Sequence, residues 1–309
     1  MRIYVGTLHT IENEFEDCVA SIRRQTHTDF KHFVFSGLGN VEAHAALYGD
    51  FLAKRDQFDV MVKVDADMVL CDDQLFENIV SRMGEEGLSK LSIAVHDWFT
   101  DRLILGLNSY RNDIQWTGDA HGAFVDRVSG MGGGFSSDWE ELAPAAYHCP
   151  NPTPFQAFHF GVHKATKVVQ MESPSRVHWR MREHWDNIAE TERHFQRSGD
   201  RRLGLVVLGS ELVYAGVLRC EHVNYSNAYL AEVFSRYEHL DSREVLLEVR
   251  RLRARNMGWL PNRIRQAWFW YRFRGDHCYG KGLRALVMDC VFPRWRGSGR
   301  EKAASARGR

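Results

Sequence analysis

The chain has 309 residues, of which 44% are hydrophobic and 26% are charged, so it is long enough for one large or two smaller globular domains. Its formal net charge of zero hides an asymmetry: residues 250–309 hold 16 Lys and Arg against 3 Asp and Glu, a balance of +13, so the first 249 residues carry −13. Six cysteines without a CxxC pair argue against a zinc ribbon or a disulfide framework, and no apolar run approaches the roughly 20 residues of a membrane span.

Strands and helices are expected to alternate in the first hundred residues. The apolar runs predict strands at 3–5, 31–37, 58–64 and 91–97, and the apolar periodicity predicts helices at 10–25 and 41–55. Thr10 is the expected N-cap of the first helix. Strands separated by helices of about 12–15 residues indicate βαβ units and a mostly parallel sheet.

The second half has a different pattern. Residues 106–153 contain GMGGGFSS and CPNPTP and show little periodicity, which predicts a long functional loop or lid. Helices are expected over 154–170, with Pro154 in the first turn, and over about 176–197. The run 203–218 is apolar throughout and fits a strand or a helix.

The stretch FDVMVKVDADMVLCDD, residues 58–73, is an apolar strand that ends on two carboxylates. Ligands bind beyond the carboxyl ends of strands in an open parallel sheet. Asp65 and Asp67 are one residue apart, so their side chains point to roughly the same side of an extended chain and can reach one hard cation such as Mg²⁺ or Mn²⁺. The alternative is an acidic turn that only terminates the strand.

In this context the sequence resembles a known family. The segments HTIENEFEDCVASIRRQTHTDFKHFVFSG and VKVDADMVLCDDQLFENIV are similar to the nucleotide-sugar half of GT-A glycosyltransferases of the family 2 type, over about residues 1–100. The resemblance implies an α/β, Rossmann-like GT-A fold, with a mostly parallel sheet flanked by helices. It also implies that Asp65 faces the ribose and the metal and that Asp67 binds Mn²⁺ or Mg²⁺ against the diphosphate of a UDP- or GDP-sugar.

The same resemblance suggests further contacts to the donor. Thr7 ends the first strand, and Glu12 or Glu14 follows where such folds contact the nucleoside, although capping of the next helix is the alternative. Ser36 ends the second strand, where many family members carry an acid. The expected donor-binding residues are Thr7, Glu12, Ser36, Lys63 and Asp65.

A third metal ligand and a catalytic base are also expected. His163 is the favoured ligand because His159 lies one helical turn before it, and His222 is a rival. An inverting transferase needs a carboxylate to deprotonate the acceptor hydroxyl. Asp97 is favoured for this role because it ends the strand beside the DxD strand, and Asp126 is the second candidate.

The C-terminal segment 250–296 interleaves arginines with aromatic residues, which favours either contact with an anionic membrane surface or packing on the main domain. No nucleic-acid-binding motif accompanies it. The start MRIYVGT reads as a strand rather than a secretory signal, so the expected location is cytoplasmic, with peripheral contact on the inner face of the membrane.

The sequence therefore predicts a transferase domain over 1–249, with a donor half at 1–100 and an acceptor half at 101–249, followed by a basic helical extension at 250–309. The expected activity is inverting hexosyl transfer from a nucleotide-sugar to a glycan or lipid-linked acceptor of the cell envelope. Two alternatives stay open: a DxD phosphatase of the haloacid-dehalogenase type, and a non-catalytic carbohydrate-binding protein on a transferase-like fold.

Overall fold

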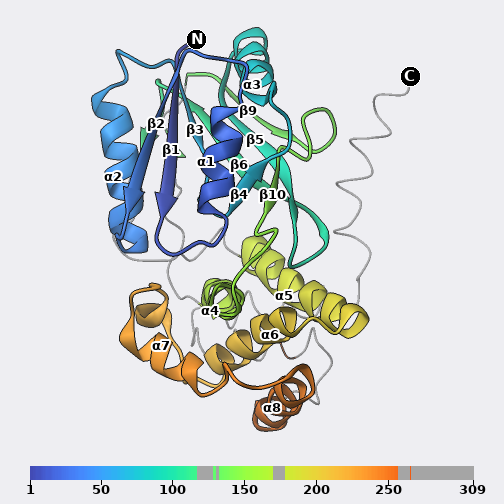
Figure 1. Cartoon of the computed structure of the whole chain (residues 1–309). Helices are drawn as coiled ribbons and strands as arrows, with labels where there is room; N and C mark the ends of the chain where they lie inside the picture. Colours follow the sequence, from blue (N-terminus) through green and yellow to red (C-terminus); the bar gives the residue numbers. More distant parts are fainter. Residues whose placement is uncertain (117–127, 130–131, 170–177, 257–264, 266–309) are drawn as a thin grey trace.

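The computed structural model describes residues 1–116, 128–129, 132–169, 178–256 and 265. A β-sheet with flanking helices forms the N-terminal part, and helices from the second half of the chain lie at one end of that sheet (Figure 1). The arrowheads of β1 and β2 point toward this helical part. The carboxyl ends of these strands therefore face the second half of the chain.

The predicted βαβ units are confirmed. They consist of β1 (Ile3–His9), α1 (Phe15–Arg23), β2 (Phe30–Ser36), α2 (Asn40–Ala53) and β3 (Val60–Lys63). β1 is the central strand of this group and pairs in parallel with both β2 and β3. The predicted N-cap at Thr10 is wrong, because α1 begins at Phe15 after Glu14 and has no side-chain cap.

The rest of the sheet is mixed in direction. It contains β4 (Met68–Leu70), β5 (Leu88–Asp97), β6 (Arg102–Arg111), β9 (Gly134–Asp138) and β10 (Ala146–His148). The strand order is β2-β1-β3-β6-β5-β10-β4, with β9 also beside β5. β6 runs antiparallel to both β3 and β5, while β9 and β10 run parallel to β5.

The expectation of a loop over 106–153 is therefore wrong in part. This region contains the end of β6, the short pair β7 (Gln115–Trp116) and β8 (Val128–Ser129), and then β9 and β10. The α/β class is confirmed, with a sheet flanked by helices in a Rossmann-like arrangement.

Alternating side chains of the strands build a core on each face of the sheet. Ile3 and Val5 belong to the cluster that also contains Ile22 of α1 and Phe76 of α3 (Leu75–Glu85). Tyr4, between them, belongs to the cluster with residues of α2, among them Leu47, Tyr48 and Phe51. The sheet is thus covered by α1 and α3 on one face and by α2 on the other.

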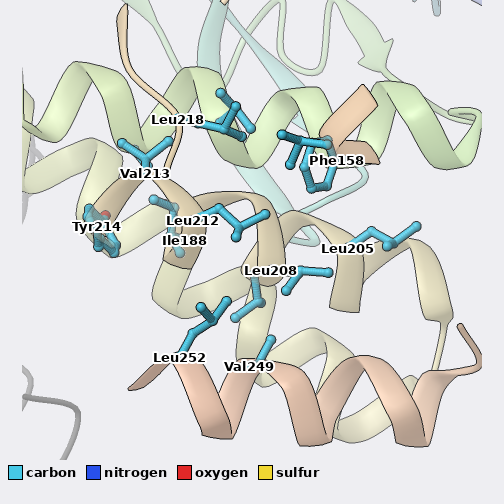
Figure 2. Close-up of a cluster of buried hydrophobic side chains, with 14 of the residues drawn as sticks. Phe158, Ile188, Leu205, Leu208, Leu212, Val213, Tyr214, Leu218, Val249 and Leu252 are labelled. Carbon is cyan, nitrogen blue, oxygen red and sulfur yellow. The ribbon is translucent and has the colours of Figure 1, made fainter. Parts of the chain in front are cut away.

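The second half of the chain forms a helical part with its own core. Its helices are α4 (Pro154–Val169), α5 (His178–Ser198), α6 (Arg201–Tyr214), η1 (Cys220–His222), α7 (Ala228–Ser235) and α8 (Ser242–Arg255). Figure 2 shows side chains of α4, α5, α6 and α8 meeting in one buried cluster, among them Phe158, Ile188, Leu208 and Val249. The run 203–218, left open between strand and helix, is mostly the helix α6.

α4 and α6 cross closely because glycines stand at the contact. A Cβ atom on Gly161 would overlap the carbonyl oxygen of Val206, and one on Gly209 would lie 2.5 Å from the carbonyl oxygen of Phe158. Among the described residues, no helix is both long and apolar enough to span a membrane.

Most of the basic segment 250–309 lies outside the described residues. Arg265 is described, and its guanidinium group pairs with the buried carboxylate of Glu211 on α6.

Candidate metal and donor site

The DxD motif occupies the short link between β3 and β4. The backbone of this link is fixed, because Ala66 N–H donates to the carbonyl of Leu8 at 3.3 Å and Met68 N–H donates to the carbonyl of Asp65 at 2.9 Å. The side chain of Ala66 is buried. Asp65 and Asp67 thus stand at the carboxyl edge of the parallel strands, as the sequence led us to expect.

Asp67 lies beside two residues from the end of β10. Its Oδ2 is 3.3 Å from His148 Nε2 and 3.3 Å from Cys149 Sγ, and these two atoms are 3.7 Å apart. The Cys149 N–H also donates to the carbonyl of Asp67 at 2.7 Å. Among the described residues this is the one group of three or more His, Cys, Asp or Glu whose ligand atoms all lie within 4.8 Å of one another.

Asp97 holds the other side of the His148 ring. Its Oδ1 is 2.6 Å from His148 Nδ1, and its Oδ2 accepts from Thr100 N–H at 2.9 Å and Thr100 Oγ1–H at 2.6 Å. Register explains the contact, because β10 pairs in parallel with β5 and places His148 opposite Asp97. Asp97 is 0% exposed and both of its oxygens are engaged, so it does not present a free carboxylate to an acceptor.

The charges of this cluster favour an ion pair when no cation is bound. Burial lowers the pKa of His148, but the negative charge of Asp67 and the hydrogen bonds to Asp67 and Asp97 outweigh burial and raise it above its ordinary value. Burial tends to raise the pKa of Asp67, and the charge of His148 nevertheless brings it down. Burial and then the charge of Asp67 raise the pKa of Cys149, so its thiol keeps its proton and donates to the carboxylate.

One atom of the cluster has no partner. Asp67 Oδ1 is buried and makes no hydrogen bond. Leaving a carboxylate oxygen buried and unsatisfied costs about 1–3 kcal/mol or more. A cation bound between this carboxylate and its neighbours would remove that cost, so the residues present fit a metal ion.

Asp65 has a different environment from Asp67. Its Oδ1 lies 2.8 Å from the Nζ of Lys63, a β3 lysine that is only 5% exposed. This ammonium group neutralises Asp65 locally at the carboxyl edge of the sheet. The two aspartates of the motif are therefore not equivalent: Asp65 is paired with the lysine Lys63, and Asp67 lies against the imidazole of His148 and the thiol of Cys149.

Two glutamates after β1 add further carboxyl groups. Burial raises the pKa of Glu12 from 4.5 to about 7 against the hydrogen bond from Thr10 N–H, and the charges of Asp67 and Asp65 add to the rise. Glu14 is buried and accepts from Gln156 Nε2 at 2.8 Å and from Asn151 N–H at 3.0 Å. The site thus gathers four carboxylates, of Glu12, Glu14, Asp65 and Asp67, which favours a cationic ligand.

The other residues expected to bind the donor lie along the ends of β1 and β2. Thr7 is buried, and its Oγ1 is 2.9 Å from His32 Nε2. Ser36 is exposed, with its Oγ 3.4 Å from His9 Nδ1. The ring of His9 stacks on Phe15 at 3.9 Å. This edge offers aromatic and hydroxyl groups.

The three histidines considered as metal ligands lie outside the Asp67 cluster. His159 Nε2 contacts the carbonyl of Val223 at 2.5 Å, and His222 Nδ1 accepts from Arg219 N–H at 3.1 Å. His163 Nε2 is buried without a hydrogen-bond partner, and its ring centroid lies 5.9 Å from that of His159. Asp126, the second candidate base, lies outside the described residues.

Sequence reasoning missed three residues of the site, which are His148, Cys149 and Tyr225. His148 and Cys149 are adjacent residues of metal-binding types, with Cys149 the first residue of the CPNPTP segment, and that adjacency was an available signal. Tyr225 follows η1, and its ring stacks on His159 at 3.7 Å. Burial raises the pKa of the Tyr225 phenol, and nearby negative groups, among them Glu12 and Asp67, raise it further.

Comparison with known proteins identifies no family. No family model matches this chain, and none of the curated proteins matches it. Among solved structures, it is similar to the mannosyltransferase PcManGT from Pyrobaculum calidifontis in complex with GDP-Man and Mn²⁺, with 12% identity, a TM-score of 0.32, and coverage of 86% of this chain and 87% of that chain. It is also similar to A197 from STIV, with 13% identity, a TM-score of 0.29, and coverage of 36% of this chain and 65% of that chain. Neither likeness is close enough to establish a function for this chain.

Proposed function

We propose that this protein is a metal-dependent glycosyltransferase that moves a sugar from a nucleoside-diphosphate-sugar, with UDP or GDP as the nucleotide, to a glycan or lipid-linked acceptor. The observation that carries the proposal is the buried, unpartnered Oδ1 of Asp67, in a DxD link at the carboxyl edge of parallel strands. Such an edge is where α/β sheets bind ligands.

In this proposal Asp67 holds the cation, and Asp65 with Lys63 lies beside the diphosphate. A divalent ion at this place neutralises the charge that develops on the departing nucleoside diphosphate. Lys63 adds a fixed positive charge in a buried setting, where such a charge acts most strongly on a phosphate.

The donor nucleoside is proposed to lie along the ends of β1 and β2, near Thr7, Glu12 and Ser36. The exposed hydroxyl of Ser36 and the His9 ring next to it are available for hydrogen bonds and stacking. Inversion at the sugar carbon is proposed from the resemblance to family 2. Because Asp97 is enclosed by His148 and Thr100, Asp126 is the proposed base.

The test is nucleoside diphosphate binding by calorimetry, with and without Mn²⁺. The intact protein is expected to bind UDP or GDP at least about tenfold more tightly with Mn²⁺, and Asp67→Asn is expected to lose that gain, a change of about 1.4 kcal/mol or more. Asp73→Asn is the matched control, because Asp73 is an exposed carboxylate six residues further along that pairs with Arg24. If Mn²⁺ strengthens nucleoside diphosphate binding as much in Asp67→Asn as in the intact protein, the proposal is wrong.

A further inference from the structure

The Asp67 cluster contains a thiol and an imidazole as well as a carboxylate. We propose that Asp67, His148 and Cys149 form a three-ligand site for a borderline transition metal of the Zn²⁺ class, and that Asp97 is the positioning residue that orients His148 toward it. This inference names the kind of ion that the site would bind. It rests on the proposed function only in giving that ion a role in sugar transfer.

The first argument for this metal site is the set of distances between its three ligand atoms. In a tetrahedral zinc centre, Zn–O and Zn–N bonds of about 2.0–2.1 Å and a Zn–S bond of about 2.3 Å put neighbouring ligand atoms roughly 3.3–3.6 Å apart. The three separations here are 3.3 Å, 3.3 Å and 3.7 Å. The cluster therefore has the spacing of one face of a tetrahedron without any side chain having to move far.

The types of donor atom carry the second step. Mg²⁺ and Mn²⁺ prefer oxygen ligands, whereas thiolate and imidazole favour Zn²⁺ and related ions. When such an ion binds, the Cys149 Sγ–H bond and the His148 Nε2–H bond both break, both protons pass to solvent, and the freed electron pairs of the sulfur and the nitrogen form the bonds to the metal. Three protein ligands leave a fourth position for a water molecule or a diphosphate oxygen.

The third argument is that Asp97 orients the ring of His148. A metal-binding histidine usually donates its other ring N–H to a carboxylate, which fixes the tautomer and the ring orientation. His148 Nδ1 is 2.6 Å from Asp97 Oδ1, so the opposite nitrogen, Nε2, is the one that faces Asp67 and Cys149. Thr100 holds Asp97 through two hydrogen bonds, so the ring orientation is fixed before any ion arrives.

The test uses the full chain, freed of metal by a chelator and titrated with Co²⁺, with Zn²⁺ and Mn²⁺ as competitors. We expect a thiolate-to-Co²⁺ charge-transfer band in the intact protein. Cys149→Ser should lose the band and bind Zn²⁺ at least about tenfold more weakly, while its Mn²⁺ affinity changes less than about threefold. Cys71→Ser is the matched control, because Cys71 is an exposed free cysteine, and it should leave both affinities unchanged.

Asp97→Asn tests the positioning role and should weaken Zn²⁺ binding by about 10–100-fold while the thiolate band persists at saturating Co²⁺. If that variant does not fold, Thr100→Val, which removes one hydrogen bond to Asp97, should weaken Zn²⁺ binding in the same direction. Unchanged Zn²⁺ affinity in Cys149→Ser, or in the folded Asp97→Asn, overturns the inference.

The metal inference and the proposed function fail separately. A thiolate band without nucleotide binding would leave the metal site standing and remove the transferase. Mn²⁺-dependent nucleotide binding without a thiolate band would support the transferase and overturn the metal inference.

Discussion

Glu12 is a site residue whose ionisation is coupled to folding. Its carboxyl group ionises near 4.5 in the unfolded chain and near 7 in the folded protein, because it is largely buried close to Asp65 and Asp67. The folded protein is therefore more stable with Glu12 protonated than with Glu12 ionised. The stability it contributes is therefore complete below pH 4.5 and is lost as the pH rises through 7.

Replacing Glu12 by Gln should remove this pH dependence. At pH 8 and in the presence of a chelator, Glu12→Gln is expected to raise the free energy of unfolding by about 1–3 kcal/mol, with the gain shrinking toward zero near pH 4.5. Glutamine can still accept the hydrogen bond from Thr10 N–H. Urea unfolding at a series of pH values measures the effect.

The control for this experiment is Glu16→Gln, which changes an exposed glutamate in the first turn of α1. Its effect on unfolding should be small and should vary little between pH 4.5 and 8. A gain in Glu12→Gln that is equally large at both ends of this range would contradict the account.

At this scale the sequence reveals some site residues and not others. Asp65 and Asp67 could be predicted because an apolar run leads directly into them, so local pattern alone places them at a strand end. The adjacency of His148 and Cys149 was a local signal, but it does not place them beside Asp67, because the three-residue strand β10 is fixed by pairing with β5 and β4, far away in the chain. Asp97 was found as a strand-end carboxylate, but its partner His148 is 51 residues distant.

Among the elements, the βαβ units followed from periodicity while the direction of β6 did not. β6 enters between β3 and β5, antiparallel to both, after a tight turn in which Asp101 has a positive φ of 53°. Strand direction depends on long-range pairing, and a run such as RLILGLNSYR shows no periodicity that distinguishes a parallel from an antiparallel strand. The same limit hid β9 and β10.

The close crossing of α4 and α6 can be tested through its glycines. Gly161→Ala is expected to lower the free energy of unfolding by about 2–3 kcal/mol, because the new methyl group overlaps the Val206 carbonyl and the helices must separate. Gly49→Ala is the matched control, since Gly49 lies inside α2 with no atom within 4 Å of the added Cβ. That change should stabilise by about 0.5–1 kcal/mol.

Urea unfolding measures both glycine variants under the same conditions. Two variants of equal stability would show that the helix crossing tolerates a methyl group and that the contact at Gly161 is not close.

In the whole molecule, the site lies where the sheet and the helical part meet. Asp67 belongs to the sheet, Cys149 precedes α4, and a hydrogen bond of 2.8 Å joins Glu14 before α1 to Gln156 in α4. The strands β6, β9 and β10 all come from beyond residue 100, yet they complete the sheet of the first hundred residues. The division into a donor half and an acceptor half stays a prediction.

Gln156 connects the two parts of the molecule at this junction. Its Nε2 donates to Glu14 at 2.8 Å, and its Oε1 accepts from Asn13 N–H at 3.1 Å and from Thr153 N–H at 3.0 Å. Both Gln156 and Glu14 are buried, so water does not replace these bonds. The amide therefore satisfies polar groups on both sides of the junction at once.

Gln156→Leu should destabilise the protein by about 2–4 kcal/mol at pH 8, because Glu14 would then be a buried carboxylate held only by backbone N–H groups, those of Asn151 and of Glu14 itself. Burial raises the pKa of Glu14 above its ordinary value, and losing the Gln156 hydrogen bond raises it further. The loss should therefore shrink as the pH falls toward 4.5 and Glu14 takes up a proton. Gln57→Leu, at an exposed turn, should change stability by less than about 0.5 kcal/mol at every pH. A loss in Gln156→Leu that persists undiminished at pH 4.5 would show that the junction is held by packing and not by the charge of Glu14.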